Sequence, residues 1–156
     1  MNKLPLFLAL LVLGVAGVST AQEAPDFSGT WELNTKKGEN LGMVAAIQET
    51  LIISQTTEQL TIDFTDVFQG KTTTRQVNYN LAGEIVANFA AMGDPSDTVS
   101  KWADGTLVTT WTSEGAVAGT QVVRTETRSL SADNDEMTVA TARGDNPAMV
   151  LVYEKR

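Results

Sequence analysis

The stretch Phe27-Ser28-Gly29-Thr30-Trp31-Glu32-Leu33 decides the fold. Apolar residues and glycine alternate with polar residues along it, and this period of two is typical of a strand with one buried face. Gly29 lets another backbone come close, and Trp31 fills the space beside it. The stretch therefore predicts the opening strand of a barrel-like core.

An apolar segment precedes this strand. Lys3 supplies a positive charge, an apolar run follows it, and small residues stand just before Gln22, which together predict a signal peptide of residues 1–21. Cleavage between Ala21 and Gln22 leaves residues 22–156 as one domain, the barrel. The run is too short and too often interrupted for a membrane anchor. We expect the mature protein in a periplasm or outside the cell.

Composition excludes several functions. The net charge is −8 and no basic cluster is present, which disfavours nucleic acid and anionic membranes as partners and stable membrane insertion. The chain has no cysteine and no histidine. Disulfides, thiol nucleophiles, Ser-His-Asp triads and almost every zinc or copper site are therefore excluded, and we expect no metal and no cofactor.

Turn signals recur through residues 34–156 at the spacing of an all-β protein. Asp104-Gly105 between two β-rich runs is the strongest hairpin signal. Residues 41–46 have room for at most one short helix, so parallel βαβ units are not expected. The pattern predicts a single antiparallel up-and-down β-barrel of eight to ten strands, because closing a meander removes its exposed edges.

The inward faces of such a barrel either line a pocket or fill a core, and the residue pattern fits both. Alternation assigns the following residues to the interior: Trp31, Ile62, Phe64, Val77, Tyr79, Leu107, Trp111, Met149, Leu151 and Tyr153.

Three short motifs resemble the calycin group of lipocalins and fatty-acid-binding proteins. Gly29-Thr30-Trp31 resembles the Gly-x-Trp of their first strand. Lys101-Trp102-Ala103-Asp104-Gly105 is similar to the Lys-Trp-Asp-Gly hairpin of fatty-acid-binding proteins, with one extra residue, and Val152-Tyr153-Glu154-Lys155 resembles their closing strand. The resemblance implies a barrel that binds a small hydrophobic molecule, with Gly29 and Trp31 as structural motif residues and Trp31 as a plug at the closed end.

Two departures separate the chain from intracellular fatty-acid-binding proteins. Their first strand is followed by a two-helix lid, whereas only Thr35 to Ala46 is available here. Their closing strand usually has Arg-x-Tyr, which grips a carboxylate, and this chain has Leu151-Val152-Tyr153. The resemblance is therefore nearest to bacterial secreted lipocalin-like proteins.

Charged residues on the strands have two possible orientations. Arg75 shares a face with Val77 and Tyr79, which places it inside or at a rim. Arg124, Glu126 and Arg128 form a row of alternating charge, which usually faces solvent, although the family pattern places an arginine inside this strand.

Asp66 continues the inward parity of the strand that contains Phe64. A bulge or strand end that turns Asp66 to solvent is nevertheless expected.

The leading hypothesis is a secreted carrier of a hydrophobic or amphipathic molecule, lipid-like or fatty-acid-like, with no catalytic residues and an undetermined oligomeric state. The residues expected to contact the ligand are Phe64, Arg75, Tyr79, Trp111, Arg128 and Tyr153. The alternatives are a filled-core structural or interaction module of the cell envelope, and an enzyme that works through paired carboxylates, for which alternation offers only Asp66.

Overall fold

The computed structural model describes residues 24–156. The predicted signal peptide, residues 1–21, and its cleavage site lie outside the described residues. No helix within residues 24–156 is long and apolar enough to cross a membrane.

Ten strands and one short 3₁₀ helix form the described chain, which confirms the predicted all-β barrel. The elements are β1 (Gly29–Leu33), η1 (Gly42–Ala46), β2 (Gln48–Gln55), β3 (Gln59–Phe68), β4 (Lys71–Asn80), β5 (Val86–Phe89), β6 (Pro95–Ala103), β7 (Thr106–Glu114), β8 (Gln121–Leu130), β9 (Glu136–Ala142) and β10 (Met149–Lys155).

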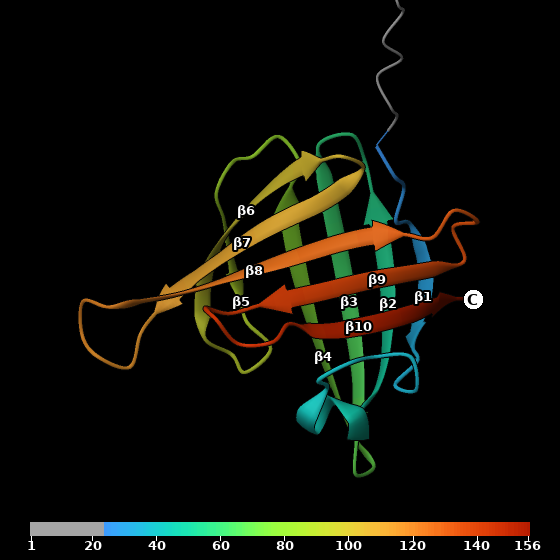
Figure 1. The fold of residues 1–156 in the computed structure, drawn as a ribbon, viewed down its shortest axis with the longest axis horizontal. Coiled ribbons are helices and arrows are strands. Elements are labelled where there is room, and N and C mark those ends of the chain that lie inside the picture. Colours follow the sequence, from blue (N-terminus) through green and yellow to red (C-terminus); the bar gives the residue numbers. More distant parts are fainter. Residues whose placement is uncertain (1–23) are drawn as a thin grey trace, which may run out of the picture.

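All neighbouring strands pair antiparallel in the order β4-β3-β2-β1-β10-β9-β8-β7-β6-β5 (Figure 1). The first strand thus pairs with the last, with Trp31 opposite Lys155. β4 and β5 stand at the two ends of this order, and no backbone ladder joins them among the described residues. We call the boundary between β4 and β5 the seam of the nearly closed barrel.

One side chain bridges the seam. Asn88 of β5 accepts a hydrogen bond from the backbone N–H of Asn78 in β4 and donates one to the Asn78 carbonyl, at 3.0 and 2.7 Å. Its amide also donates to Thr98 Oγ1 at 2.8 Å, which fixes the side chain from β6. A primary amide carries both a donor and an acceptor, so it can replace a pair of ladder bonds.

The hairpin between β6 and β7 forms as its sequence predicts. Ala103 pairs with Thr106, so Asp104 and Gly105 are the two loop residues. Their φ angles are 48° and 74°. Positive φ at both positions is characteristic of the tight turn that matches the twist of paired strands, and aspartate and glycine tolerate it.

Aromatic residues close the end of the barrel that carries the β2–β3 turn. Phe27 and Trp31 are fully buried, and the indole N–H of Trp31 donates to the Phe27 carbonyl at 2.9 Å. The ring of Phe27 stacks on Trp102 with centroids 6.0 Å apart. Gly29 does admit a close neighbour, but this neighbour is the Lys155 side chain rather than a backbone: a Cβ on Gly29 would lie 3.0 Å from Lys155 Cε.

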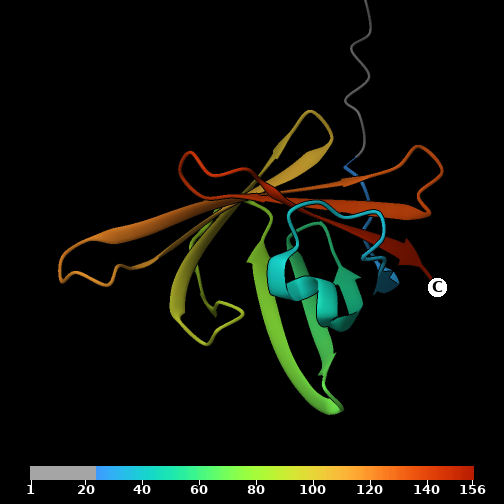
Figure 2. The ribbon, with the colours of Figure 1, turned by 60° about the horizontal axis from the view of Figure 1, so that its bottom comes forward.

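The opposite end carries η1 and the β3–β4 turn, and the turn projects beyond the helix (Figure 2). The helix is a single five-residue segment with no buried residue. It is therefore the short helix that the sequence allows, and it covers far less than a two-helix lid would.

Candidate ligand-binding site

The barrel interior has an apolar side and a polar side. β2, β3 and β4 contribute Leu51, Ile62 and Val77, all fully buried. β6 and β7 contribute small hydroxyl side chains, of which Ser100 and Thr109 are hydrogen-bonded to each other at 2.8 Å. This division gives the interior the amphipathic lining that small-molecule sites commonly have.

A buried ion pair lies inside the barrel between β4 and β8, in what we call the inner cluster: Tyr79, Glu126 and Arg128. Arg128 is only 3% exposed, and its Nη2 donates to Glu126 Oε1 at 2.9 Å. The Tyr79 hydroxyl donates to the same oxygen at 3.4 Å. Burial opposes the charged form of Arg128, but Glu126 and Tyr79 favour it, and the pKa of Arg128 is raised. Arg128 is therefore a buried cation whose charge is balanced by the Glu126 carboxylate.

A second group, the outer cluster, lies nearer η1 and consists of Glu49, Asp66, Arg75 and Tyr153. The Tyr153 hydroxyl donates to Glu49 Oε1 at 2.5 Å, and Arg75 Nη2 donates to Glu49 Oε2 at 3.4 Å. Arg75 Nε lies 3.9 Å from Asp66 Oδ2. Burial and the neighbouring Asp66 raise the pKa of Glu49 to about 7, although the Tyr153 hydroxyl opposes the rise. This cluster can hold one proton near neutral pH.

Aromatic rings connect the charged groups. Arg75 lies over the Phe64 ring, 3.3 Å from its centroid, and Arg124 lies over Trp111 at 4.4 Å. Trp111 meets Tyr79 edge to face with centroids 6.0 Å apart. Cations over aromatic faces are stabilised by the ring quadrupole, so the arginines keep favourable contacts without additional carboxylates.

Five buried side-chain atoms of the described chain have no hydrogen-bond partner. They are Asp66 Oδ1, Arg75 Nε, Trp111 Nε1, Arg128 Nε and Arg128 Nη1. Four of the five are N–H donors. Since an unpaired buried polar group costs about 1–3 kcal/mol, these atoms are available to a water or to a polar group of a ligand.

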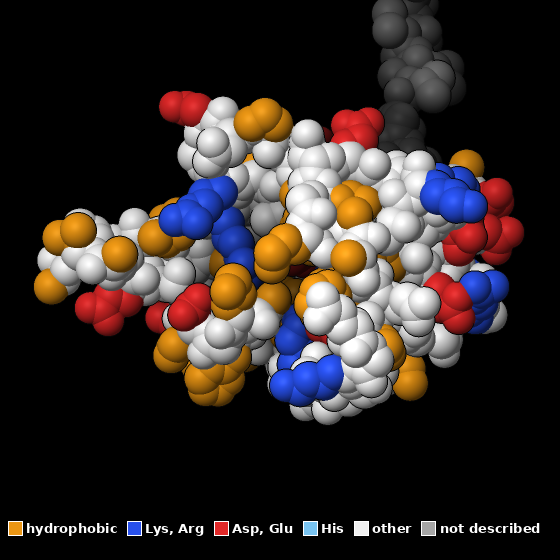
Figure 3. Space-filling view, turned by 90° about the horizontal axis from the view of Figure 1, so that it is seen from below, with side chains coloured by type: hydrophobic (Ala, Val, Ile, Leu, Met, Phe, Trp, Pro, Cys, Tyr) orange, Lys and Arg blue, Asp and Glu red, His pale blue; other side chains and the backbone are white. Residues whose placement is uncertain are grey.

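The outer cluster reaches solvent at the end beside η1. Figure 3 views the molecule from this end and shows a small hollow, ringed by hydrophobic side chains, in which acidic and basic side chains are visible. The outer cluster is partly exposed, with 25% of the Arg75 side chain and 21% of the Asp66 side chain accessible. The charged groups of the outer cluster are therefore accessible to solvent at the η1 end.

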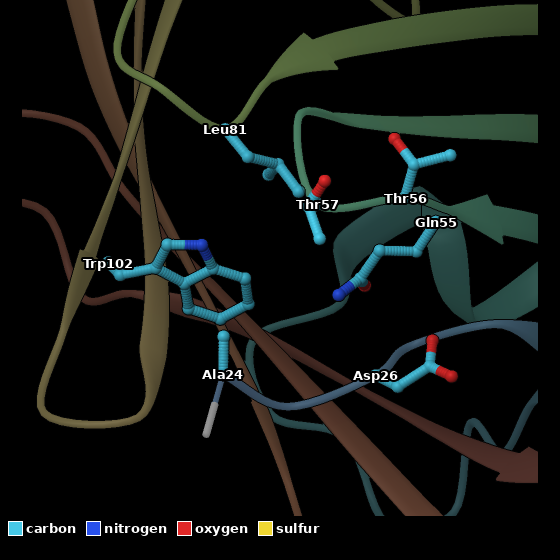
Figure 4. A pocket seen from close by; sticks show the side chains of 7 residues that line it. All are labelled: Ala24, Asp26, Gln55, Thr56, Thr57, Leu81 and Trp102. Atoms are coloured by element: carbon cyan, nitrogen blue, oxygen red, sulfur yellow. The ribbon is translucent and has the colours of Figure 1, made fainter. Parts of the chain in front are cut away.

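Two pockets lie away from the centre of the barrel. One of about 450 Å³ is at the closed end, where Trp102 and Leu81 face Gln55 and Asp26 (Figure 4). Its wall includes Ala24, the first described residue, and we assign it no ligand. The second, about 200 Å³, adjoins Arg124 and Met92.

All six predicted ligand contacts lie on the inner face of the barrel. Phe64, Tyr79, Trp111, Arg128 and Tyr153 are buried, and Arg75 is half-buried. Tyr79 and Arg128 belong to the inner cluster and Arg75 and Tyr153 to the outer one, whereas Trp111 contacts Tyr79 and Phe64 contacts Arg75, so the six do not form a single contact point.

Two orientations expected from the sequence are wrong. The charged row in β8 does not face solvent: Arg128 is buried opposite Leu107, and Arg124 lies opposite Trp111 on the same inner face. Asp66 is not turned out by a bulge, because it sits in a regular ladder opposite Glu49 and Thr73. Aromatic rings and counter-charges inside the barrel make these inward positions favourable.

Glu49 and Glu126 are the two site residues that sequence reasoning missed. Glu49 has the same parity as Leu51 and Ile53, so alternation could have placed it inside. Glu126 shares a face with Arg128, and the sequence pattern predicts that this face is exposed to solvent. Together with Asp66 they make three carboxylates that point into the barrel, whereas alternation alone predicts only Asp66.

Comparison with protein-family models found no match, and comparison with curated proteins found none either. Solved structures do share the fold. The fatty-acid-binding protein of Schistosoma mansoni, in complex with arachidonic acid, matches with a TM-score of 0.64 at 14% identity, over 83% of this chain and 96% of that chain. Human cRBP IV matches with a TM-score of 0.63 at 14% identity, over 85% and 99% of the two chains.

A mutant of the fluorescent protein UnaG also matches, with a TM-score of 0.66 at 20% identity over 83% of this chain and 96% of that chain. The chain therefore has the barrel fold of fatty-acid-binding and retinol-binding proteins. At these identities the likeness concerns the fold alone.

Proposed function

We propose that this protein is an exported carrier that binds a small hydrophobic or amphipathic molecule inside the barrel. The observation that carries the proposal is the set of unpartnered N–H groups around the inner cluster, next to an apolar wall. A ligand with an apolar body and a polar end would cover the wall and occupy those donors.

The fold supports a binding role. Solved structures that share it include a fatty-acid-binding protein in complex with arachidonic acid. The proposed contacts are the six residues predicted from the sequence, with Glu49 and Glu126 added. Nearness to bacterial secreted lipocalin-like proteins and export through residues 1–21 belong to the same proposal and rest on the sequence.

Native mass spectrometry tests the proposal most directly. Protein purified from its natural host is expected to carry a co-purifying adduct of lipid size that organic extraction removes. Titration of the extracted protein with that molecule should then change tryptophan fluorescence, because Trp111 lies beside Tyr79 in the site.

Variants in which one tryptophan at a time is replaced show which indole reports ligand binding. Trp111→Phe should abolish most of the fluorescence change, whereas Trp102→Phe, at the closed end, should preserve it. A clean apo mass together with no fluorescence change across a lipid panel would contradict the proposal.

That negative result would favour the second candidate, a filled-core structural or interaction module. The observation on its side is the dense interior, in which Ser100 and Thr109 satisfy each other and Arg128 is satisfied in part by Glu126. Such a module would use its outer face and needs no ligand.

A further inference from the structure

We propose that the ligand's polar end is an uncharged hydrogen-bond acceptor, a carbonyl or hydroxyl oxygen, and that Glu126 makes the site discriminate against carboxylates. The inference rests on the proposed function and specifies the ligand class of the same site. It concerns the inner cluster, where the unpartnered donors are concentrated.

Arg128 still has N–H groups that can donate hydrogen bonds, but its positive charge is already balanced by the Glu126 carboxylate. Its Nη2 is already bonded to Glu126 Oε1 at 2.9 Å, while its Nε and Nη1 are buried without partners. An acceptor oxygen bound there would lie close to the Glu126 carboxylate. A neutral oxygen completes the hydrogen bonding of Arg128, whereas an anion would also be repelled by Glu126.

The Tyr153 hydroxyl is not free to bind an anion in its present arrangement. It donates to Glu49 Oε1 at 2.5 Å, and a hydroxyl has only one proton to donate. A carboxylate that approached Tyr153 would have to displace Glu49, and it would also meet Asp66, the cross-strand neighbour of Glu49. The tyrosine therefore adds no attraction for an anionic ligand.

The balance of unpartnered atoms points in the same direction. Trp111 Nε1 adds one more donor without charge, and Trp111 and Arg128 both flank Tyr79, with the Arg128 guanidinium 5.7 Å from the Tyr79 ring centroid. Because Arg128 is already paired with Glu126 and donors are in surplus, the inner cluster selects ligands by hydrogen-bond acceptors rather than by pairing a ligand charge with Arg128.

Matched probes test the inference, namely retinol against retinoate and 1-hexadecanol against palmitate, each pair sharing one apolar body. Affinities are measured at pH 8 by fluorescence for the first pair and by displacement of retinol for the second. We expect the alcohol of each pair to bind at least about tenfold more tightly than the carboxylate, the size of effect that one unfavourable charge in a buried site produces.

Glu126→Gln is the decisive variant, because it keeps the shape and removes the charge. It should strengthen carboxylate binding by about tenfold and change alcohol binding by less than about threefold. Glu32→Gln is the matched control: it removes the same charge from an exposed residue that pairs with Arg156, and it should leave both affinities unchanged.

The remaining outcomes all overturn the inference. Preference for the carboxylates, or an alcohol-to-carboxylate ratio that Glu126→Gln leaves unchanged, overturns the inference while carrier function stands. If the folded wild-type protein binds neither member of either pair, the inference fails, and the proposed function is decided separately by the native mass and the lipid panel. Circular dichroism shows whether each variant is folded.

Discussion

Asn88 forms two hydrogen bonds with the backbone of a single residue, Asn78, across the seam between β4 and β5. A side chain thus takes the place of the backbone ladder at the one boundary where the strand order ends. The bonds hold the two strand edges together, and the third bond to Thr98 limits rotation of the amide.

Asn88→Ala is expected to destabilise the protein by about 1–3 kcal/mol, because it removes the bridge and leaves the polar groups of Asn78 and Thr98 without these partners. Urea denaturation measures the loss, and hydrogen exchange of the Asn78 amide should accelerate. Asn146→Ala, which changes an exposed turn, is the control and should stay within about 0.5 kcal/mol. Equal stability of the two variants would show that the bridge contributes nothing.

The raised pKa of Glu49 predicts a dependence of stability on pH. The folded pKa is about 7 and the ordinary value is 4.5, so the folded state holds a proton that the unfolded chain releases earlier. This contribution to stability is fully present below pH 4.5 and is lost as the pH rises to 7.

Glu49→Gln replaces the titrating carboxyl with an amide, so the free energy of unfolding should fall less between pH 5 and 8 than in wild type. At pH 8 the variant should be more stable than wild type. Denaturation midpoints at several pH values measure the change in stability. The NMR chemical shift of the Glu49 carboxyl carbon follows the titration of the group itself. A stability curve that keeps its slope in Glu49→Gln would show that Glu49 is not the source of the pH dependence.

Trp31→Ala tests the plug at the closed end. It empties a fully buried position and removes the bond to the Phe27 carbonyl, so we expect a loss of about 3–5 kcal/mol. Thermal and denaturant unfolding measure it. Met43→Ala, in the exposed helix η1, should change stability by less than about 0.5 kcal/mol. A loss below about 1 kcal/mol at Trp31 would contradict a closing role.

Gly105→Ala tests the two-residue turn between β6 and β7. Its φ of 74° is in the left-handed region, where a Cβ costs about 1–2 kcal/mol. Asp104→Asn keeps a residue that tolerates this region and should stay near wild type. Chemical denaturation measures the stability of both variants. If Gly105→Ala were as stable as wild type, a positive φ at Gly105 would be contradicted.

Alternation predicted the barrel because strands with one buried face follow a strict period of two, as Leu60, Ile62 and Phe64 show. The hairpin at Asp104-Gly105 was predictable because positive φ limits the residues that can occupy it. The single short helix followed from the few residues between β1 and β2.

Charged residues were harder to orient than apolar ones. A charge pattern such as Arg124, Glu126 and Arg128 has the same period whether it faces water or the interior, and only the partners on β4 and β7 decide between them. Glu49 became a site residue through Tyr153, more than 100 positions away, a contact that no local pattern contains. The seam bridge from Asn88 likewise depends on strands that do not share a ladder.

The pairing of β1 with β10 makes the order of synthesis matter. A nascent chain that stops before Met149 presents two unpaired strand edges, on β1 and β9, and such edges invite pairing with other chains. The ring can close only after the last strand emerges, and contacts between such distant segments form slowly. Until then the chain has most of its strands and none of the protection of a closed barrel, so truncation near the C-terminus should be more harmful than its length suggests.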